Sequence, residues 1–170
     1  IGMDSRIGNK FLKSSVGFGG SCFQKDILNL VYIAKTLGLD EVSEYWNQVI
    51  KMNNYQKERF AKKIMTSLFG TVSGKKITLF GWAFKKNTND TRESAAIYVA
   101  DILIENGAQI CVYDPKVSEQ QMLTDLDNLN TRTSEQNKKA LSYYSEPLKA
   151  CENSHAVAVI TEWDLSLIHI

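Results

Sequence analysis

The hydrophobic positions follow a helical period in the first part of the chain and a mixed helix and strand pattern beyond it. From Asp26, apolar side chains recur three or four residues apart and stop at Gly38, which predicts a first helix. Residues 39–69 contain neither glycine nor proline and carry a wide apolar stripe. They predict a second, unusually long helix, which either bends near Asn53-Asn54 or spans two domains.

From Lys75 onward, short apolar runs alternate with helical patterns. Strands are expected at 77–80, 110–113, 141–144 and 156–160, the last being the clearest buried strand. Helices are expected at 91–106 and in a short segment that Ser145 and Pro147 open, whereas the polar residues 118–139 predict no definite element. Such alternation predicts a parallel sheet with right-handed crossovers, in which ligands bind beyond the carboxyl ends of the strands.

The predicted fold class is therefore α/β, with two parts. A helical segment is expected over residues 1–69, and a Rossmann-like parallel-sheet domain over residues 70–170. A chain of 170 residues with 44% hydrophobic content can bury a core of this size. The wide stripe on residues 39–69 leaves two interpretations open: it packs only on the second domain, or it also associates with another chain.

The candidate chemistry lies in the glycine-rich residues 16–26, which bring one cysteine to the start of the first helix. Glycines let the backbone approach a ligand closely, although short glycine motifs also occur in loops without a function. Free N–H groups at a helix N-terminus favour a thiolate, so Cys22 is a candidate nucleophile. Asp26 follows one turn later on the same face, where it either complements the helix dipole or positions a water molecule.

Two longer strings make the interpretation specific. Residues 17–26 (GFGGSCFQKD) and residues 80–94 (FGWAFKKNTNDTRES) resemble the cysteine segment and the sugar-nucleotide loop of the UDP-glucose/GDP-mannose dehydrogenase family. The resemblance extends from about residue 6 to residue 163, and within the family the sequence resembles the animal members. The family's nicotinamide-binding domain would precede Ile1. The Phe-Gln pair after Cys22 favours UDP-glucose over GDP-mannose as the substrate.

The resemblance implies NAD-dependent, four-electron oxidation of UDP-glucose to UDP-glucuronate through a thiohemiacetal and a thioester on Cys22, with Asp26 supporting the acid–base steps. It implies substrate contacts by two loops, namely by Arg6, Lys13, Ser14, Ser15, Val16, Gly17, Phe18, Gly19, Phe84 and Lys85. It implies cofactor contacts on the nicotinamide side, by Cys22, Phe23, Gln24, Lys25 and Arg92.

The same resemblance implies partners. Arg6 would contact substrate bound to a neighbouring subunit. The subunits would form a homo-oligomer built from dimers, such as a hexamer. Arg92 opposes the dipole of the predicted helix 91–106, which favours a functional role for it. We expect this chain to be an inactive fragment on its own, with a divergent tail at residues 164–170. The competing hypothesis is a non-catalytic sugar-nucleotide-binding or oligomerisation module on the same fold.

Composition excludes several other classes. The net charge of +1 gives no reason to expect nucleic acid or an anionic membrane. Three widely spaced cysteines indicate reduced thiols and a cytoplasmic location, with Cys111 and Cys151 as ordinary buried thiols. No metal-ligand spacing is present, so His155 is expected to be structural.

Asp114 ends the second predicted strand. Its position is explained as well by a turn as by a contact to a ribose.

Overall fold

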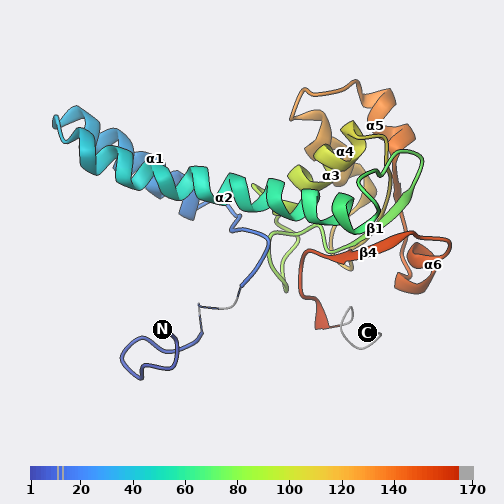
Figure 1. Cartoon of the computed structure of the whole chain (residues 1–170), viewed down its shortest axis with the longest axis horizontal. Helices are drawn as coiled ribbons and strands as arrows, with labels where there is room; N and C mark the ends of the chain where they lie inside the picture. The colour runs from blue at the N-terminus through green and yellow to red at the C-terminus, as the bar shows by residue number, and fades with distance from the viewer. Residues whose placement is uncertain (11, 13, 165–170) are drawn as a thin grey trace.

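The structure is a computed structural model and describes residues 1–10, 12 and 14–164 (Figure 1). Its elements, in chain order, are α1 (Phe23–Thr36), α2 (Asp40–Ser67), β1 (Lys76–Phe80), α3 (Ala95–Glu105), β2 (Gln109–Tyr113), α4 (Glu119–Asp127), α5 (Ser134–Ala140), β3 (Leu141–Tyr143), α6 (Pro147–Cys151) and β4 (Ala156–Val159).

Helices α1 and α2 form a hairpin, called the arm below, that extends to one side of the sheet (Figure 1). The turn between them is possible because Gly38 adopts a φ of 70°, and the N–H of Leu39 returns to the carbonyl of Ala34. Helix α2 continues unbroken through Asn53-Asn54 for 28 residues, or about 42 Å. Of the two predicted alternatives, the structure has the one in which the helix spans two regions.

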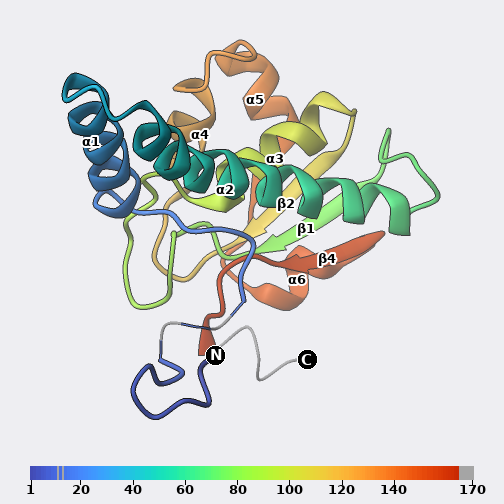
Figure 2. The ribbon, with the colours of Figure 1, turned by 60° about the vertical axis from the view of Figure 1, so that its left-hand side comes forward.

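The described strands form one parallel sheet in the order β3-β2-β1-β4, which confirms the predicted α/β, Rossmann-like fold. Alternate side chains point to opposite faces. Ile77 and Leu79 of β1 belong to the large core under α2, α3 and α4, whereas Phe80 packs with Tyr113 and Ala150 on the face covered by α6 (Figure 2). The end of α2 joins the large core through Ala61, which is fully buried.

Three details differ from the sequence predictions. Strand β4 is not well buried: it pairs with β1 on one side only among the described residues, and Val157 is 47% exposed. Helix α3 begins at Ala95 rather than at residue 91, because Ser94 caps it and accepts a hydrogen bond from the N–H of Ala96. The polar residues 118–139 form α4 and α5, and a capping box between Thr133 and Gln136 opens the second.

Candidate functional site

The glycine-rich loop before α1 lies against α2. Buried Asn53 binds both polar groups of the Phe18 backbone: its Oδ1 accepts the N–H at 2.9 Å, and its Nδ2 donates to the carbonyl at 3.0 Å. Gly17 leaves room for this contact, since a Cβ on it would lie 2.8 Å from Asn53 Oδ1. Phe18 also packs edge-to-face on Phe23, with ring centroids 4.7 Å apart. The loop is therefore fixed before it reaches the cysteine.

The same loop lies against the segment that follows β1. The N–H of Gly20 donates to the Arg92 carbonyl at 2.7 Å. A Cβ on Gly19 would lie 2.5 Å from the Glu93 carbonyl oxygen, and one on Gly20 would meet the Phe84 ring at 2.9 Å. These close approaches require glycine, and they join the two sequence strings that the family resemblance singled out.

Cys22 is the N-cap residue of α1, at the helix start where the sequence predicts it, and its side chain is exposed. Its Sγ lies 3.6 Å from the hydroxyl of Ser21. The N–H of Asp26 donates to the Cys22 carbonyl at 2.9 Å, so the carboxylate lies in the first turn of the helix. An exposed thiol at a helix N-terminus has the environment of a reactive cysteine.

A cleft of about 390 Å³ opens at the carboxyl ends of β1 and β4. It is lined by Ser14, Ser15, Gly17, Phe18, Gly19, Ala83, Phe84, Lys85, Lys86, Ser94, Ala95, Ile160, Thr161 and Glu162. The exposed Lys85 ammonium lies 5.2 Å from the Phe84 ring centroid, and the N-terminus of α3 contributes Ser94 and Ala95. A cation and a helix N-terminus on one cleft favour an anionic ligand such as a phosphate group.

A second cleft, of about 410 Å³, lies beside the cysteine and is lined by Gly20, Ser21, Gln24, Lys25, Leu28, Arg92 and Glu93. Three of the predicted cofactor residues, Gln24, Lys25 and Arg92, therefore meet in space. Arg92 binds Asp90 through two guanidinium hydrogen bonds of 2.9 and 2.7 Å. This pairing raises the pKa of Arg92 and lowers the pKa of Asp90.

Some predicted site residues lie elsewhere. The N-terminal segment projects away from the sheet (Figure 1). Within it, Arg6 pairs with Asp4, and the Arg6 side chain is 87% exposed and lines neither cleft. Lys13 lies outside the described residues. Val16 is buried in the large core and does not line the main cleft. Arg92 precedes α3 instead of lying in its first turn, so the argument from an unfavourable helix dipole was wrong.

Other side chains prove structural. Both carboxylate oxygens of Asp114 are buried and accept hydrogen bonds from the N–H groups of Trp82, Ala83, Lys116 and Val117 and from the Trp163 indole, which supports the turn interpretation. His155 Nδ1 accepts the N–H of Lys76 at 3.1 Å, a structural contact as predicted. Cys111 is buried as predicted, whereas Cys151 is only half-buried.

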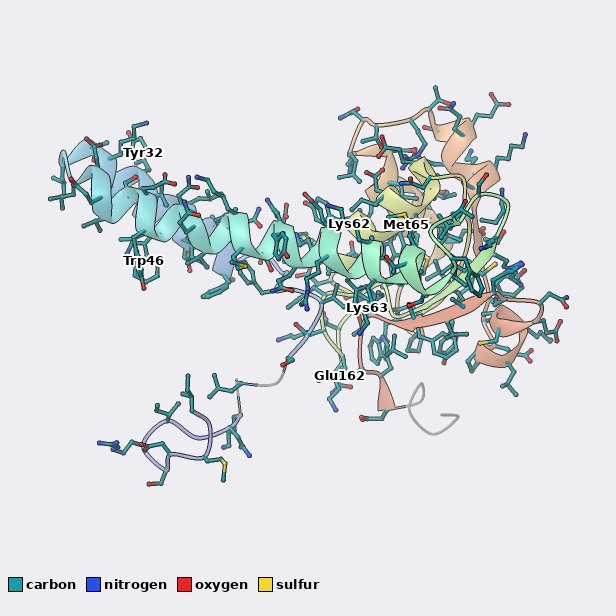
Figure 3. The ribbon with its side chains drawn as sticks, viewed as in Figure 1. Tyr32, Trp46, Lys62, Lys63, Met65 and Glu162 are labelled. Carbon is teal, nitrogen blue, oxygen red and sulfur yellow. The ribbon has the colours of Figure 1, made fainter. Side chains whose placement is uncertain are left out.

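Sequence reasoning missed part of the cleft. Lys86 lines the cleft and binds Asp164 at 2.9 Å. Glu162, labelled in Figure 3, follows β4 together with Thr161, and the rule that ligands bind at the carboxyl ends of strands would have indicated both. Asn53 carried no usable signal, because a polar residue inside a long helix is ordinarily solvent-exposed.

Within the part of the chain that the structure describes, no group of three or more His, Cys, Asp or Glu side chains is arranged to hold a metal ion. None of the described helices combines the length and the apolar character needed to cross a membrane.

A parallel sheet with a cleft at its carboxyl end defines a Rossmann-like nucleotide-binding class. The profile of the UDP-glucose/GDP-mannose dehydrogenase family, UDP binding domain, matches residues 78–165, and that of the family's central domain matches residues 1–55. The chain belongs to the UDP-glucose/GDP-mannose dehydrogenase family, as its sequence strings indicated.

Individual relatives sharpen this result. The chain is 54% identical over 165 residues to UDP-glucose 6-dehydrogenase of Pongo abelii, covering 97% of this chain and 33% of the relative. It is 57% identical to the Drosophila melanogaster enzyme of the same name, and that match covers 96% of this chain and 35% of the relative. The chain thus spans about a third of the length of these curated relatives.

Solved structures agree. A UDP-glucose dehydrogenase from Pyrobaculum islandicum superposes with a TM-score of 0.77 at 31% identity, covering 97% of this chain and 35% of that chain. A GDP-mannose dehydrogenase from Pseudomonas aeruginosa superposes with a TM-score of 0.70 at 20% identity, covering 95% of this chain and 35% of that chain. At this identity the two chains are similar in fold alone.

Proposed function

We propose that this chain supplies the nucleophilic cysteine and the sugar-nucleotide cleft of an enzyme that oxidises UDP-glucose to UDP-glucuronate with NAD. The observation that carries the proposal is the hydrogen bond of 2.7 Å between the Gly20 N–H and the Arg92 carbonyl. It joins the loop of Cys22 to the segment that follows β1, whose Phe84 and Lys85 line a cleft suited to an anionic ligand. The names of relatives at 53–57% identity support UDP-glucose as the sugar nucleotide.

Different residues of the cleft would bind different parts of UDP-glucose. Lys85 and the N-terminus of α3 would bind the diphosphate, because Lys85 presents a positive charge and α3 presents the positive end of its helix dipole to the same space. The hydroxyls of Ser14 and Ser15 and the backbone of the glycine loop would bind the polar groups of the sugar and uridine. Arg6, on the projecting N-terminal segment, would reach substrate on a neighbouring subunit, and Lys13 would join the loop contacts.

The residues of the second cleft fit NAD, since Gln24 offers an amide, and Lys25 and Arg92 offer positive charge suited to a pyrophosphate. Phe23, exposed beside Cys22, adds an aromatic surface on this side. When bound, NAD takes up two electrons at each of the two oxidation stages from alcohol to acid. The remainder of such a site would be supplied by residues outside this chain.

Cys22 would act on the aldehyde that the first oxidation leaves. Its thiolate forms a bond to the carbonyl carbon, and the oxygen takes up a proton, which gives a thiohemiacetal. Loss of a hydride from the carbon and of the hydroxyl proton would give a thioester, and water would then attack the carbon, expel the thiolate and leave a carboxylate. Asp26, in the first turn after Cys22, would position that water and accept its proton.

We further propose a dimer-based homo-oligomer in the cytoplasm, with the arm at the subunit contact. Tyr32 and Trp46 project from this arm (Figure 3), and Tyr32 is 66% exposed. GDP-mannose is the less favoured substrate, because the solved GDP-mannose dehydrogenase is only 20% identical. A non-catalytic module is also less favoured, since it has no use for an exposed thiol at a helix N-terminus.

The test is the rate at which iodoacetamide alkylates Cys22 in the folded chain, measured by peptide mass spectrometry with and without UDP-glucose. Burial raises the pKa of the Cys111 and Cys151 thiols, so both should react slowly with iodoacetamide while the chain is folded. Fast alkylation of these two cysteines would therefore indicate unfolding. The proposal expects saturating UDP-glucose to slow Cys22 alkylation about tenfold, and GDP-mannose to leave it unchanged. Equal rates with and without UDP-glucose would contradict it.

Turnover by this chain alone is a separate matter. Because the chain spans about a third of its relatives, we expect no NADH from purified chain supplied with NAD and UDP-glucose. Steady NADH formation that Cys22→Ser abolishes would overturn this expectation while supporting the assignment of the cysteine.

A further inference from the structure

Lys57 of α2 is a charged residue in an unusual environment. Its side chain is only 2% exposed, and among the described residues its Nζ is the buried side-chain nitrogen that has no hydrogen-bond partner. It lies 3.8 Å from the centroid of the Tyr98 ring. A buried ammonium is costly unless its surroundings compensate, so its place in the fold calls for an explanation.

The compensation comes from Glu93. The Tyr98 hydroxyl donates a hydrogen bond of 2.7 Å to Glu93 Oε2, and all three residues line one cavity of about 300 Å³. Burial lowers the pKa of Lys57, and the negative charge of Glu93 opposes that shift. The ammonium, the ring and the carboxylate thus form one cluster between α2 and α3, called the Lys57 cluster below.

Glu93 carries this cluster to the loop of the cysteine. It adopts a φ of 55°, a left-handed conformation that is unfavourable for a non-glycine residue. Its carbonyl is the atom that Gly19 approaches so closely that no Cβ fits, and the preceding carbonyl, of Arg92, accepts the N–H of Gly20. The backbone at 92–93 is therefore the surface on which the loop rests, two residues before Cys22.

Helix α2 holds this loop a second time. Asn53 lies one turn before Lys57 on the same face and binds the Phe18 backbone directly. Lys57 would act at the other side of the loop through Glu93. Of these two successive turns of α2, the first thus contacts the glycine loop directly through Asn53, and the second reaches it through the Lys57 cluster and the backbone of Glu93.

We propose that Lys57 is a positioning residue: its buried charge holds the turn at residues 92–93 in the left-handed conformation that supports Gly19 and Gly20, and so fixes Cys22. The inference rests on the proposed function for the role of Cys22, whereas the chain of contacts stands apart from it. Neither motif of the family resemblance contains Lys57.

The test is hydrogen exchange of single amides, measured by NMR on the chain and on Lys57→Met, which keeps an unbranched side chain one atom shorter and removes the charge. The expected result is that the Gly20 amide exchanges about tenfold faster, while amides of β1 and β2 keep their rates within about twofold. Unchanged exchange at Gly20 would overturn the proposal. So would parallel acceleration in β1, since that would reflect a general loss of stability.

Three further variants make the test specific. Lys57→Arg keeps the charge and should restore Gly20 protection, whereas Lys63→Met, at an exposed lysine of the same helix (Figure 3), should change nothing. Glu93→Gln should loosen Gly20 as Lys57→Met does, and the double variant should add little, because both act through one contact. Full additivity of the two would contradict the proposal. A negative alkylation test would reject the role of Cys22 and leave these exchange results standing.

Discussion

The arm and the sheet differ in how they use apolar side chains. In the sheet, Ile77 and Leu79 are fully buried between β1 and the helices that cover it. In the arm, Tyr32, Leu37 and Tyr45 are 66%, 69% and 69% exposed, although the apolar residues of this region also follow a helical period. A helical period therefore specifies a helix, but burial depends on a covering partner. The site lies where the two regions meet, because α2 belongs to both.

The largest effect should separate these two regions. Leu79→Ala should lower the free energy of unfolding by about 3 kcal/mol, because it leaves a cavity in a close-packed core. Leu37→Ala, the matched change in the arm, should alter it by less than about 0.5 kcal/mol. Urea unfolding followed by circular dichroism measures both. Equal losses would mean that the arm is as well packed as the sheet.

The next effect concerns buried charge in the sheet region. Asp114→Asn should lower the free energy of unfolding by about 2 kcal/mol, because an amide donor would replace an oxygen that accepts from buried N–H groups. Glu152→Gln, at an exposed carboxylate, is the control and should cost less than about 0.5 kcal/mol. A negligible loss for Asp114→Asn would refute the structural role of this carboxylate.

The sequence predicts the elements that a local pattern defines better than the features that depend on contacts between distant segments. Strand β1 and helix α1 were predictable within a few residues, because a local pattern and a glycine stop define each of them. The exposure of β4 was not, since strand order depends on pairing between distant segments. The start of α3 was missed because the left-handed turn at Glu93 depends on tertiary contacts, although Ser94 is an ordinary cap.

The site divides in the same way. Residues of the two motif strings meet in the clefts as expected, because their own loops carry them there. Asn53 and Lys57 could not be singled out, since their importance arises only where a long helix crosses the loop of another segment. The catalytic and binding roles themselves stay predictions until ligands are measured.

A smaller effect tests charge in the cleft against charge in the arm. Lys85→Met should weaken UDP-glucose binding about tenfold, because one charge-assisted contact to the diphosphate is lost. Lys35→Met, at an exposed lysine in the last turn of α1, should leave the dissociation constant unchanged. If both variants bind like the parent chain, Lys85 makes no contribution to binding.

The smallest effect is the pH dependence of the Asp90–Arg92 pair. Arg92 lowers the pKa of Asp90 in the folded chain, so the pair stabilises the fold above the unfolded pKa of about 4 and ceases to do so as pH falls through the lower folded value. The difference in unfolding free energy between the chain and Asp90→Asn should therefore shrink as pH falls from about 5 to about 2. A difference that stays constant would exclude this linkage.

The most direct test of the account is calorimetric titration of the chain with UDP-glucose, with GDP-mannose as the control. The account predicts saturable binding of UDP-glucose at one site per chain, and none of GDP-mannose, because the cleft beyond β1 and β4 forms within the described residues. A folded chain that binds neither compound, or binds both equally, would contradict it.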